Sequence, residues 1–325
     1  MKKSKLILIA VSVVIVVLAV FGFYLRFGLP SAGKPENIKV EVTAERVARG
    51  EYLANHVYAC MDCHSTRDWN RFTGPLKPGT LGQGGEIFDK NSGVPGTVYS
   101  RNITPAALGS WTDGEILRAI AGGVSKDGRA LFPIMPYVNY SKTDREDLYA
   151  IIAYLRSIPP VANQVPESKV NFPMSLIIKT IPKKPIFTKM PDPADTLAYG
   201  AYLLNAASCA DCHTRMVKGK PVKGMELAGG FAFPLPTGGT VTSANLTPDK
   251  ATGLGGWTEQ SFVDQFRLYA DSTYIPDKVS KGDYNTMMPW MMYGKMKADD
   301  LKAIWRHLQT IPAVKNEVTK FTPAN

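Results

Sequence analysis

Two pentapeptides of this sequence hold the residue types of a redox cofactor site: Cys60-Met61-Asp62-Cys63-His64 and Cys209-Ala210-Asp211-Cys212-His213. C-x-x-C-H is the attachment signature of c-type haem, in which two thiols add across the vinyl groups and the adjacent histidine binds the iron. The motifs use all four cysteines and two of the four histidines of the chain. We therefore expect two covalently bound haem c groups. The predicted attachment residues are Cys60, Cys63, Cys209 and Cys212, and the predicted proximal iron ligands are His64 and His213.

Other uses of the cysteines fit the sequence less well. A disulfide framework is typical of small domains with denser cysteine usage. A zinc site built from two C-x-x-C pairs would leave the following histidines unexplained, and the pairs lie about 150 residues apart. A thioredoxin-like redox pair needs a βαβ context, which this sequence does not show.

The chain repeats itself, and the repeat selects the remaining iron ligands. The matched segments are G-x-Y-L-x-N at 50–55 and 200–205, G-T-x-x-S-x-N-[IL]-T-P at 96–105 and 239–248, W-T at 111–112 and 257–258, and M-P-aromatic at 135–137 and 288–290. Cytochromes c commonly pair histidine with methionine. Of the 12 methionines, Met135 and Met288 occupy matched positions, so we predict these two as sixth ligands.

Several neighbouring side chains compete for the sixth position. Met287, Met291 and Met292 could replace Met288 if the loop were shifted, and otherwise they would pack around the macrocycle. His56 lies close to Cys60 in sequence, which makes the far face of the haem hard to reach, and His307 has no counterpart in the first repeat. We expect both histidines to be surface or core residues.

Two smaller predictions concern the surroundings of the haem. The carbonyl of Pro75 is a candidate acceptor for the Nδ1–H of His64, which would fix the ring. Asn102 and Asn245 could bind a haem propionate, but Asn before Thr-Pro is also ordinary turn chemistry, and we favour the turn.

Periodicity predicts helices in both repeats. The last helix of each carries apolar residues at i, i+3, i+4 and i+7, over 148–155 and 301–308. Thr143 with Glu146 has the spacing of a capping box. A second helix is expected from Thr112, with Glu115 three positions on, and another from Thr258. A short helix should lead into each haem motif. With little period-two alternation, we predict an all-α fold with long Gly/Pro loops.

The N-terminal residues predict a membrane anchor. Lys2, Lys3 and Lys5 precede an apolar run from Leu6 to Leu25, which is long enough to span a bilayer as a helix. A cleavable signal peptide has a shorter apolar core and an A-x-A site, so we favour a retained single-pass helix. The leading lysines place the N-terminus in the cytoplasm. The haem domains would then lie on the periplasmic side of a bacterial inner membrane.

The predicted organisation has five parts: a transmembrane anchor (1–28), a linker (29–43), a first haem domain (44–160), a Pro-rich linker (161–196) and a second haem domain (197–325). The Pro-rich linker should be extended. Its apolar cluster at 174–178 could pack on a domain or touch the membrane, and we favour packing. The formal charge of +10 forms no basic stripe, so we expect no nucleic-acid partner.

With these residues in view, the chain resembles membrane-anchored multihaem cytochromes c. It looks most like the cytochrome c subunits of bacterial membrane-bound alcohol, gluconate and aldehyde dehydrogenases. Those subunits typically carry three haem motifs and often anchor near the C-terminus, whereas this chain has two motifs and an N-terminal apolar run. The resemblance implies a class I cytochrome c fold for each repeat, with His/Met ligation.

The expected function is that of a membrane-anchored dihaem electron carrier, more a relay than an enzyme. Electrons would pass from a dehydrogenase or quinone pathway to another cytochrome or a terminal oxidase of a respiratory chain. Two alternatives stay open: a dihaem peroxidase-like oxidoreductase with one open haem, and a haem subunit of a larger respiratory complex.

Overall fold

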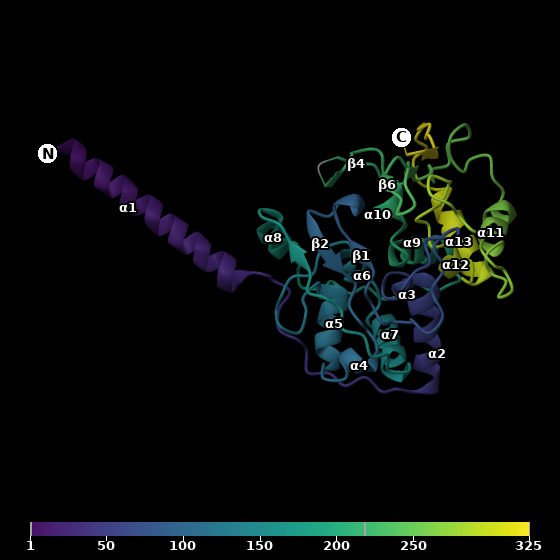
Figure 1. Cartoon of the computed structure of the whole chain (residues 1–325), viewed down its shortest axis with the longest axis horizontal. Coiled ribbons are helices and arrows are strands. Elements are labelled where there is room, and N and C mark those ends of the chain that lie inside the picture. The colour runs from purple at the N-terminus through teal and green to yellow at the C-terminus, as the bar shows by residue number, and fades with distance from the viewer. Residues whose placement is uncertain (1, 218, 325) are drawn as a thin grey trace.

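The computed structural model describes residues 2–217 and 219–324. A long helix projects from a body in which the two repeats pack against each other (Figure 1). The helices of the first repeat and its surroundings are α1 (Lys2–Phe23), α2 (Ala44–Tyr52), α3 (Cys60–Cys63), α4 (Pro105–Leu108), α5 (Asp113–Gly122), α6 (Tyr137–Tyr140), α7 (Arg145–Ser157) and α8 (Met174–Ile177). Those that follow are α9 (Thr196–Ala206), α10 (Cys209–His213), α11 (Glu259–Arg267), α12 (Trp290–Tyr293) and α13 (Ala298–Leu308).

The first and last helices of each repeat pack together: α2 on α7, and α9 on α13. A glycine allows the close approach in both cases. A Cβ on Gly50 would lie 1.9 Å from the carbonyl oxygen of Ala150, and one on Gly200 would lie 2.0 Å from that of Ala303. Any side chain at either position would force the helices apart. The recurring glycine of the sequence is therefore a helix-packing residue.

The prediction of an all-α fold was wrong. The described residues also form three small antiparallel sheets, with strand orders β1-β2-β3, β4-β5 and β6-β7-β8. The strands are β1 (Ile87–Phe88), β2 (Gly96–Tyr99), β3 (Lys169–Val170), β4 (Met216–Val217), β5 (Lys220–Pro221), β6 (Ala232–Pro234), β7 (Thr240–Thr242) and β8 (Phe321–Thr322). Segments of two to four residues are too short to show the alternation from which strands are predicted.

The sheets repeat as the helices do. The central strands β2 and β7 arise from the recurring Gly-Thr segments at 96–97 and 239–240. Each takes a partner from the segment that follows the last helix of its repeat: Thr97 pairs with Lys169, and Val241 pairs with Phe321. The segment 161–196, predicted as an extended linker, therefore contributes a strand and also the one-turn helix α8.

The recurring asparagines make the same contacts in both repeats. Asn102 donates to the carbonyl of Val161 (2.8 Å) and accepts from the backbone N–H of Thr104 (2.9 Å). Asn245 donates to Val314 (2.7 Å) and accepts from Thr247 (2.9 Å). Both side chains are used within the fold, which supports the turn interpretation over propionate binding. The duplication thus extends to individual hydrogen bonds.

Capping explains where two of the predicted helices begin. The predicted helix start at Thr112 is confirmed by a capping box, because the hydroxyl of Thr112 accepts from the N–H of Glu115 and the Glu115 carboxylate accepts from the N–H of Thr112. At α7 the prediction was wrong by one residue. Asp144 caps that helix, whereas the Thr143 hydroxyl donates to the carbonyl of Tyr140. A carboxylate at the cap out-competes the neighbouring hydroxyl.

Matched residues also join the two repeats. Tyr52 on α2 donates to Asp300 on α13 (2.5 Å), and Tyr202 on α9 donates to Asp147 on α7 (2.7 Å). Tyr52 and Tyr202 are equivalent in the repeat, as are Asp147 and Asp300. The repeats therefore exchange equivalent contacts, and buried residues of both belong to one hydrophobic core.

Among the described residues one helix is long and apolar enough to cross a membrane, over Ser4–Phe23, and none of that stretch is buried against the body. The segment after it lies along the body. Ser31 donates to the carbonyl of Pro182, Glu36 pairs with Arg145, and the N–H of Val40 donates to Asp113. Residues 29–43, predicted as a linker, are thus attached at several points.

Candidate functional site

The two C-x-x-C-H motifs fold alike. Each forms a single helical turn, α3 or α10, and each follows a residue in the left-handed region, Ala59 (φ 48°) or Ser208 (φ 54°). Residues other than glycine adopt this backbone conformation rarely, and such residues recur at functional sites. All four cysteines are unpaired. Cys60 and Cys209 are half-buried, and Cys63 and Cys212 are exposed.

Each motif histidine is held through one ring nitrogen. The Nδ1 of His64 donates to the carbonyl of Arg101 (2.7 Å), and the Nδ1 of His213 donates to that of Ala244 (2.8 Å). Since a carbonyl only accepts, Nδ1 carries the proton and Nε2 keeps its lone pair for a metal. Burial lowers the pKa of both imidazoles, which favours the neutral form that ligates.

The predicted acceptor for His64 was wrong. The carbonyl of Pro75 accepts the N–H of Asp68 instead. The sequence analysis missed Arg101 and Ala244, and also Gly84 and Gly229, whose N–H groups donate to the carbonyls of His64 and His213 (2.8 and 2.7 Å). The repeat contained a signal for these contacts. Gly-Gly recurs at 84–85 and 229–230, and the carbonyl acceptors Arg101 and Ala244 each directly precede the recurring asparagine.

The Met-Pro-aromatic segments form the same turn in both repeats. Pro136 has φ −80° and ψ 48°, and Pro289 has φ −80° and ψ 62°. The N–H of Tyr137 donates to the carbonyl of Met135, and that of Trp290 donates to Met288, each at 2.8 Å. This is an inverse γ-turn, which proline favours through its fixed φ. Both predicted methionine ligands are half-buried directly before a one-turn helix.

The competing side chains have other contacts. His56 donates from Nδ1 to the carbonyl of Met292 (3.2 Å), and burial lowers its pKa. His307 lies where α13 meets α9, since its Cβ would be 3.0 Å from a Cβ on Gly200. Met292 is buried, and Met287 lines a cavity beside Cys63.

A buried ion pair connects the first motif to the loop after it. Arg67 contacts the Asp62 carboxylate at 2.8 Å, and the two side chains are only 4% and 11% exposed. Burial raises the pKa of Asp62 to about 6, and the charge of Arg67 opposes that rise. Arg67 also donates to the carbonyl of Thr73 and stacks over Trp69. The loop 67–75 is therefore fixed against the motif.

This loop reaches the predicted methionine ligand of the other repeat. The Thr73 hydroxyl donates to the carbonyl of Met288 (2.6 Å), and the N–H of Thr73 donates to the side chain of Asn285 (2.8 Å). Asn285 is fully buried and also caps the N–H of Thr286. The Met288 turn is thus held by a residue of the first repeat.

A second contact joins the motif of the second repeat to the Met-Pro turn of the first repeat. Asp211 of the second motif accepts from Asn139 (2.8 Å), which belongs to α6 and follows Met135 by four residues. Burial raises the pKa of Asp211, and the hydrogen bond from Asn139 opposes that rise. Each motif is therefore connected to the predicted methionine loop of the other repeat.

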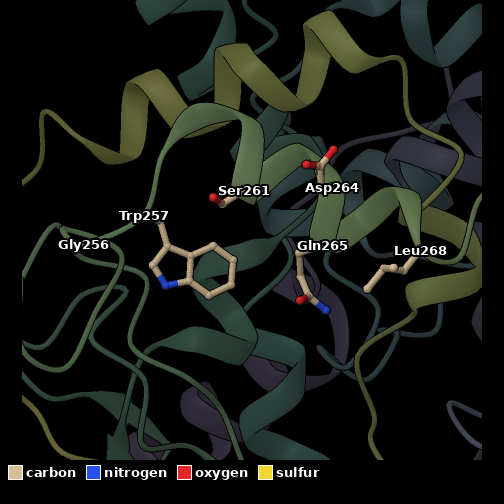
Figure 2. Close-up of a pocket in the computed structure, with 6 residues that line it drawn as sticks. All are labelled: Gly256, Trp257, Ser261, Asp264, Gln265 and Leu268. Carbon is tan, nitrogen blue, oxygen red and sulfur yellow. The ribbon is translucent and has the colours of Figure 1, made fainter.

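Two of the hollows of the body bear on the location of the site. An open one is lined by Trp257, Ser261, Asp264, Gln265 and Leu268, and none of the motif cysteines or histidines is among its lining residues (Figure 2). A narrower cavity lies at Cys63 and combines Asp62, Arg67 and Glu86 with Pro234 and Met287 of the second repeat. The cavity at Cys63 adjoins the motif, so it belongs to the candidate site.

Comparison with known proteins finds cytochrome subunits of dehydrogenases among the relatives of this chain. The chain is 29% identical over 293 residues to the alcohol dehydrogenase (quinone) cytochrome c subunit of Gluconacetobacter polyoxogenes. The matched region covers 85% of this chain and 58% of that protein. It is 29% identical over 291 residues to the gluconate 2-dehydrogenase cytochrome c subunit of Pantoea cypripedii, covering 85% and 62%. A diheme cytochrome c-type protein of Cereibacter sphaeroides is 27% identical over 266 residues, covering 78% and 82%.

No family model matches the chain. The chain spans less than two thirds of the length of the alcohol and gluconate dehydrogenase subunits. The resemblance predicted from the motifs is nevertheless confirmed, because homologues at about 29% identity over 85% of the chain are cytochrome c subunits of dehydrogenases.

Proposed function

We propose that this chain is a membrane-anchored dihaem cytochrome c that relays single electrons. The observation that carries the proposal is the paired geometry: two C-x-x-C-H turns, each with a histidine whose Nδ1 is tied to a backbone carbonyl. Its relatives are cytochrome c subunits of alcohol, gluconate and fructose dehydrogenases, so a dehydrogenase is the partner class we propose for electron entry.

The residues of the site fit a covalently attached haem. Four unpaired cysteines in two helical turns offer the thiols, and the neutral Nε2 of each histidine offers an iron ligand. Met135 and Met288 would supply the second axial ligand, which raises the potential of a haem relative to bis-histidine ligation. The haem, when bound, supplies one-electron chemistry. The protein fixes the ring orientation through Arg101 and Ala244.

The repeats would act as two electron sites in one rigid body. They share a core and exchange the Tyr52–Asp300 and Tyr202–Asp147 contacts, so the distance between the sites would stay constant during transfer. The N-terminal helix would hold this body at the periplasmic face of the inner membrane, which raises its effective concentration near membrane-bound partners. Downstream, the electron acceptor would be another cytochrome or a terminal oxidase.

Intact mass and potentiometric titration of the purified full chain test the proposal. Two covalently added haems and two one-electron steps are expected. Met135→Ala and Met288→Ala should each lower the potential of one step and leave the other in place, because each removes the thioether ligand from one iron. A polypeptide mass without added haem would overturn the proposal, and two unshifted steps would overturn the methionine assignment.

A further inference from the structure

The segment 168–191 carries exposed apolar side chains beside the end of the N-terminal helix. Phe172 is 79% exposed and Ile177, on α8, is 47% exposed. In Figure 1, α8 lies at the edge of the body from which α1 projects. The prediction that the cluster 174–178 packs on a domain is correct for Ile178, which is buried, but Ile177 and Phe172 face solvent.

The same segment is purely basic. Between residues 168 and 191 there are five lysines and no aspartate or glutamate. Lys183 and Lys184 are exposed, and Lys179 on the turn after α8 is half-buried. Segments that bind the surface of anionic membranes combine exposed apolar side chains with lysines in this way.

The backbone places this segment close to the membrane boundary. The helical stretch ends at Gly28, and Ser31 already contacts the segment, donating to the carbonyl of Pro182 (3.2 Å) and forming a bridge with Lys183. Three residues span at most about 10 Å. Lys183 therefore cannot lie far from the point at which the anchor would leave the bilayer.

The backbone on both sides of the exposed apolar side chains is held by the body. The N–H of Asn171 donates to the carbonyl of Pro95, and Lys169 is paired into the β2-β3 ladder. Pro182 and Ile178 are buried against the body. The segment is thus fixed at both ends while Phe172 and Ile177 point out of it.

We infer that Phe172, Ile177, Lys179, Lys183 and Lys184, here named the juxtamembrane patch, dock on an anionic lipid surface and set the orientation of the body on the bilayer. The inference rests on the proposed membrane anchor and adds a second contact to it. A five-residue patch alone binds a membrane weakly. A patch next to a spanning helix is already held at the membrane surface, so its effective concentration there is high and weak contacts suffice for docking.

Cysteine accessibility in nanodiscs of anionic lipid tests the patch. The full chain is prepared as Ile177→Cys and, as a matched control, Ile275→Cys in the loop after α11, where the isoleucine is 72% exposed. The native cysteines are expected in thioether bonds, so the introduced thiol reacts alone with a charged maleimide. Alkylation should be slow at 177 and fast at 275 in nanodiscs, and fast at both in detergent at high salt.

Two further measurements identify what covers the patch. Lipids with a photoreactive acyl chain should crosslink to the peptide around residue 177 and not to that around residue 275. K183Q with K184Q should raise alkylation at 177 by up to about thirtyfold, since each lysine near an anionic surface contributes roughly a fivefold factor.

The outcomes separate the patch from the anchor. If the full chain does not co-migrate with nanodiscs, the anchor fails and the patch with it. If the chain co-migrates and residue 177 is alkylated as fast as residue 275, the patch alone is overturned. Slow alkylation at 177 without lipid crosslinks would mean that protein covers it, which also overturns the inference.

Discussion

At the scale of single residues, the two candidate iron sites are alike in their histidines and different in their methionines. His64 and His213 each donate to a backbone carbonyl, at 2.7 and 2.8 Å. The carbonyl of Met288 accepts two hydrogen bonds, from Trp290 and from Thr73 of the other repeat. That of Met135 accepts from Tyr137. The second site therefore depends on the first repeat for its geometry.

Thr73→Val is expected to loosen the Met288 turn, because valine keeps the shape but removes the hydroxyl that donates to Met288. The potential of one haem should fall and its methionine–iron absorption band should weaken, with the other haem unchanged. The free energy of unfolding should fall by about 0.5–1.5 kcal/mol, the typical net contribution of one hydrogen bond to stability.

Thr73→Ser is the matched control for this experiment and should restore both signals, since it returns the hydroxyl. If the valine variant keeps both potentials and the full band, Thr73 does not position the ligand.

His56 is expected to make stability depend on pH. Burial lowers its folded pKa below the ordinary value of 6.5, so the unfolded chain binds a proton more readily than the folded chain. Its contribution to stability is therefore present above pH 6.5 and is lost as the pH falls from 6.5 through the folded pKa. Chemical unfolding between pH 5 and 7.5 should show a steeper loss in the parent than in His56→Asn, whose amide can still donate to Met292. Parallel curves would contradict this assignment.

At the scale of elements, the structure rests on one arrangement used twice, a first helix crossing a last helix at a glycine. The sequence predicted these helices well, because apolar periodicity and the Thr112–Glu115 cap are local signals. It failed on the strands, which are two to four residues long and owe their pairing to segments as distant as Phe321. It also failed on the acceptor for His64, since Arg101 lies 37 residues away in sequence. Contacts of this range are set by tertiary packing.

Gly50→Ala and Gly200→Ala should each destabilise one helix pair, because the added Cβ would lie within 2.0 Å of a carbonyl oxygen. Overpacking of this kind costs roughly 1–3 kcal/mol, measured as a lower midpoint in denaturant. Gly256→Ala is a fitting control, since its nearest neighbour is 3.7 Å away. A destabilisation equal to that of the control would mean that the helices can separate freely.

At the scale of the whole molecule, the two repeats pack against each other and exchange contacts, and they do not form two separate tandem domains. Tyr52 and Tyr202 cross to the opposite repeat, and each C-x-x-C-H motif is connected to the other repeat's Met-Pro turn through Thr73 or Asn139. Repetition in the sequence predicted two equivalent units. It did not predict their interlocking, because the contacts that join them connect residues between 55 and 248 positions apart, beyond any local pattern.

Tyr202→Phe should weaken both repeats at once. It removes a hydrogen bond to the buried carboxylate of Asp147, and a bond to a charged group is worth about 1.5–3 kcal/mol. Hydrogen exchange should rise in α7 as well as in α9. Tyr149→Phe is the control, since its hydroxyl contacts Arg145 within the same helix. Faster exchange confined to α9 would show that the repeats are independent.

The segment between the N-terminal helix and the body has little freedom to extend, because Ser31, Glu36 and Val40 each contact a different part of the body. These contacts restrict the motion of the body relative to the N-terminal helix. The body would carry its redox centres at a nearly constant height above the lipid headgroups and meet other proteins only by sliding sideways. If the proposed anchor and electron-transfer role hold, the partners of this protein would present their own electron-transfer surface at that same distance from the bilayer.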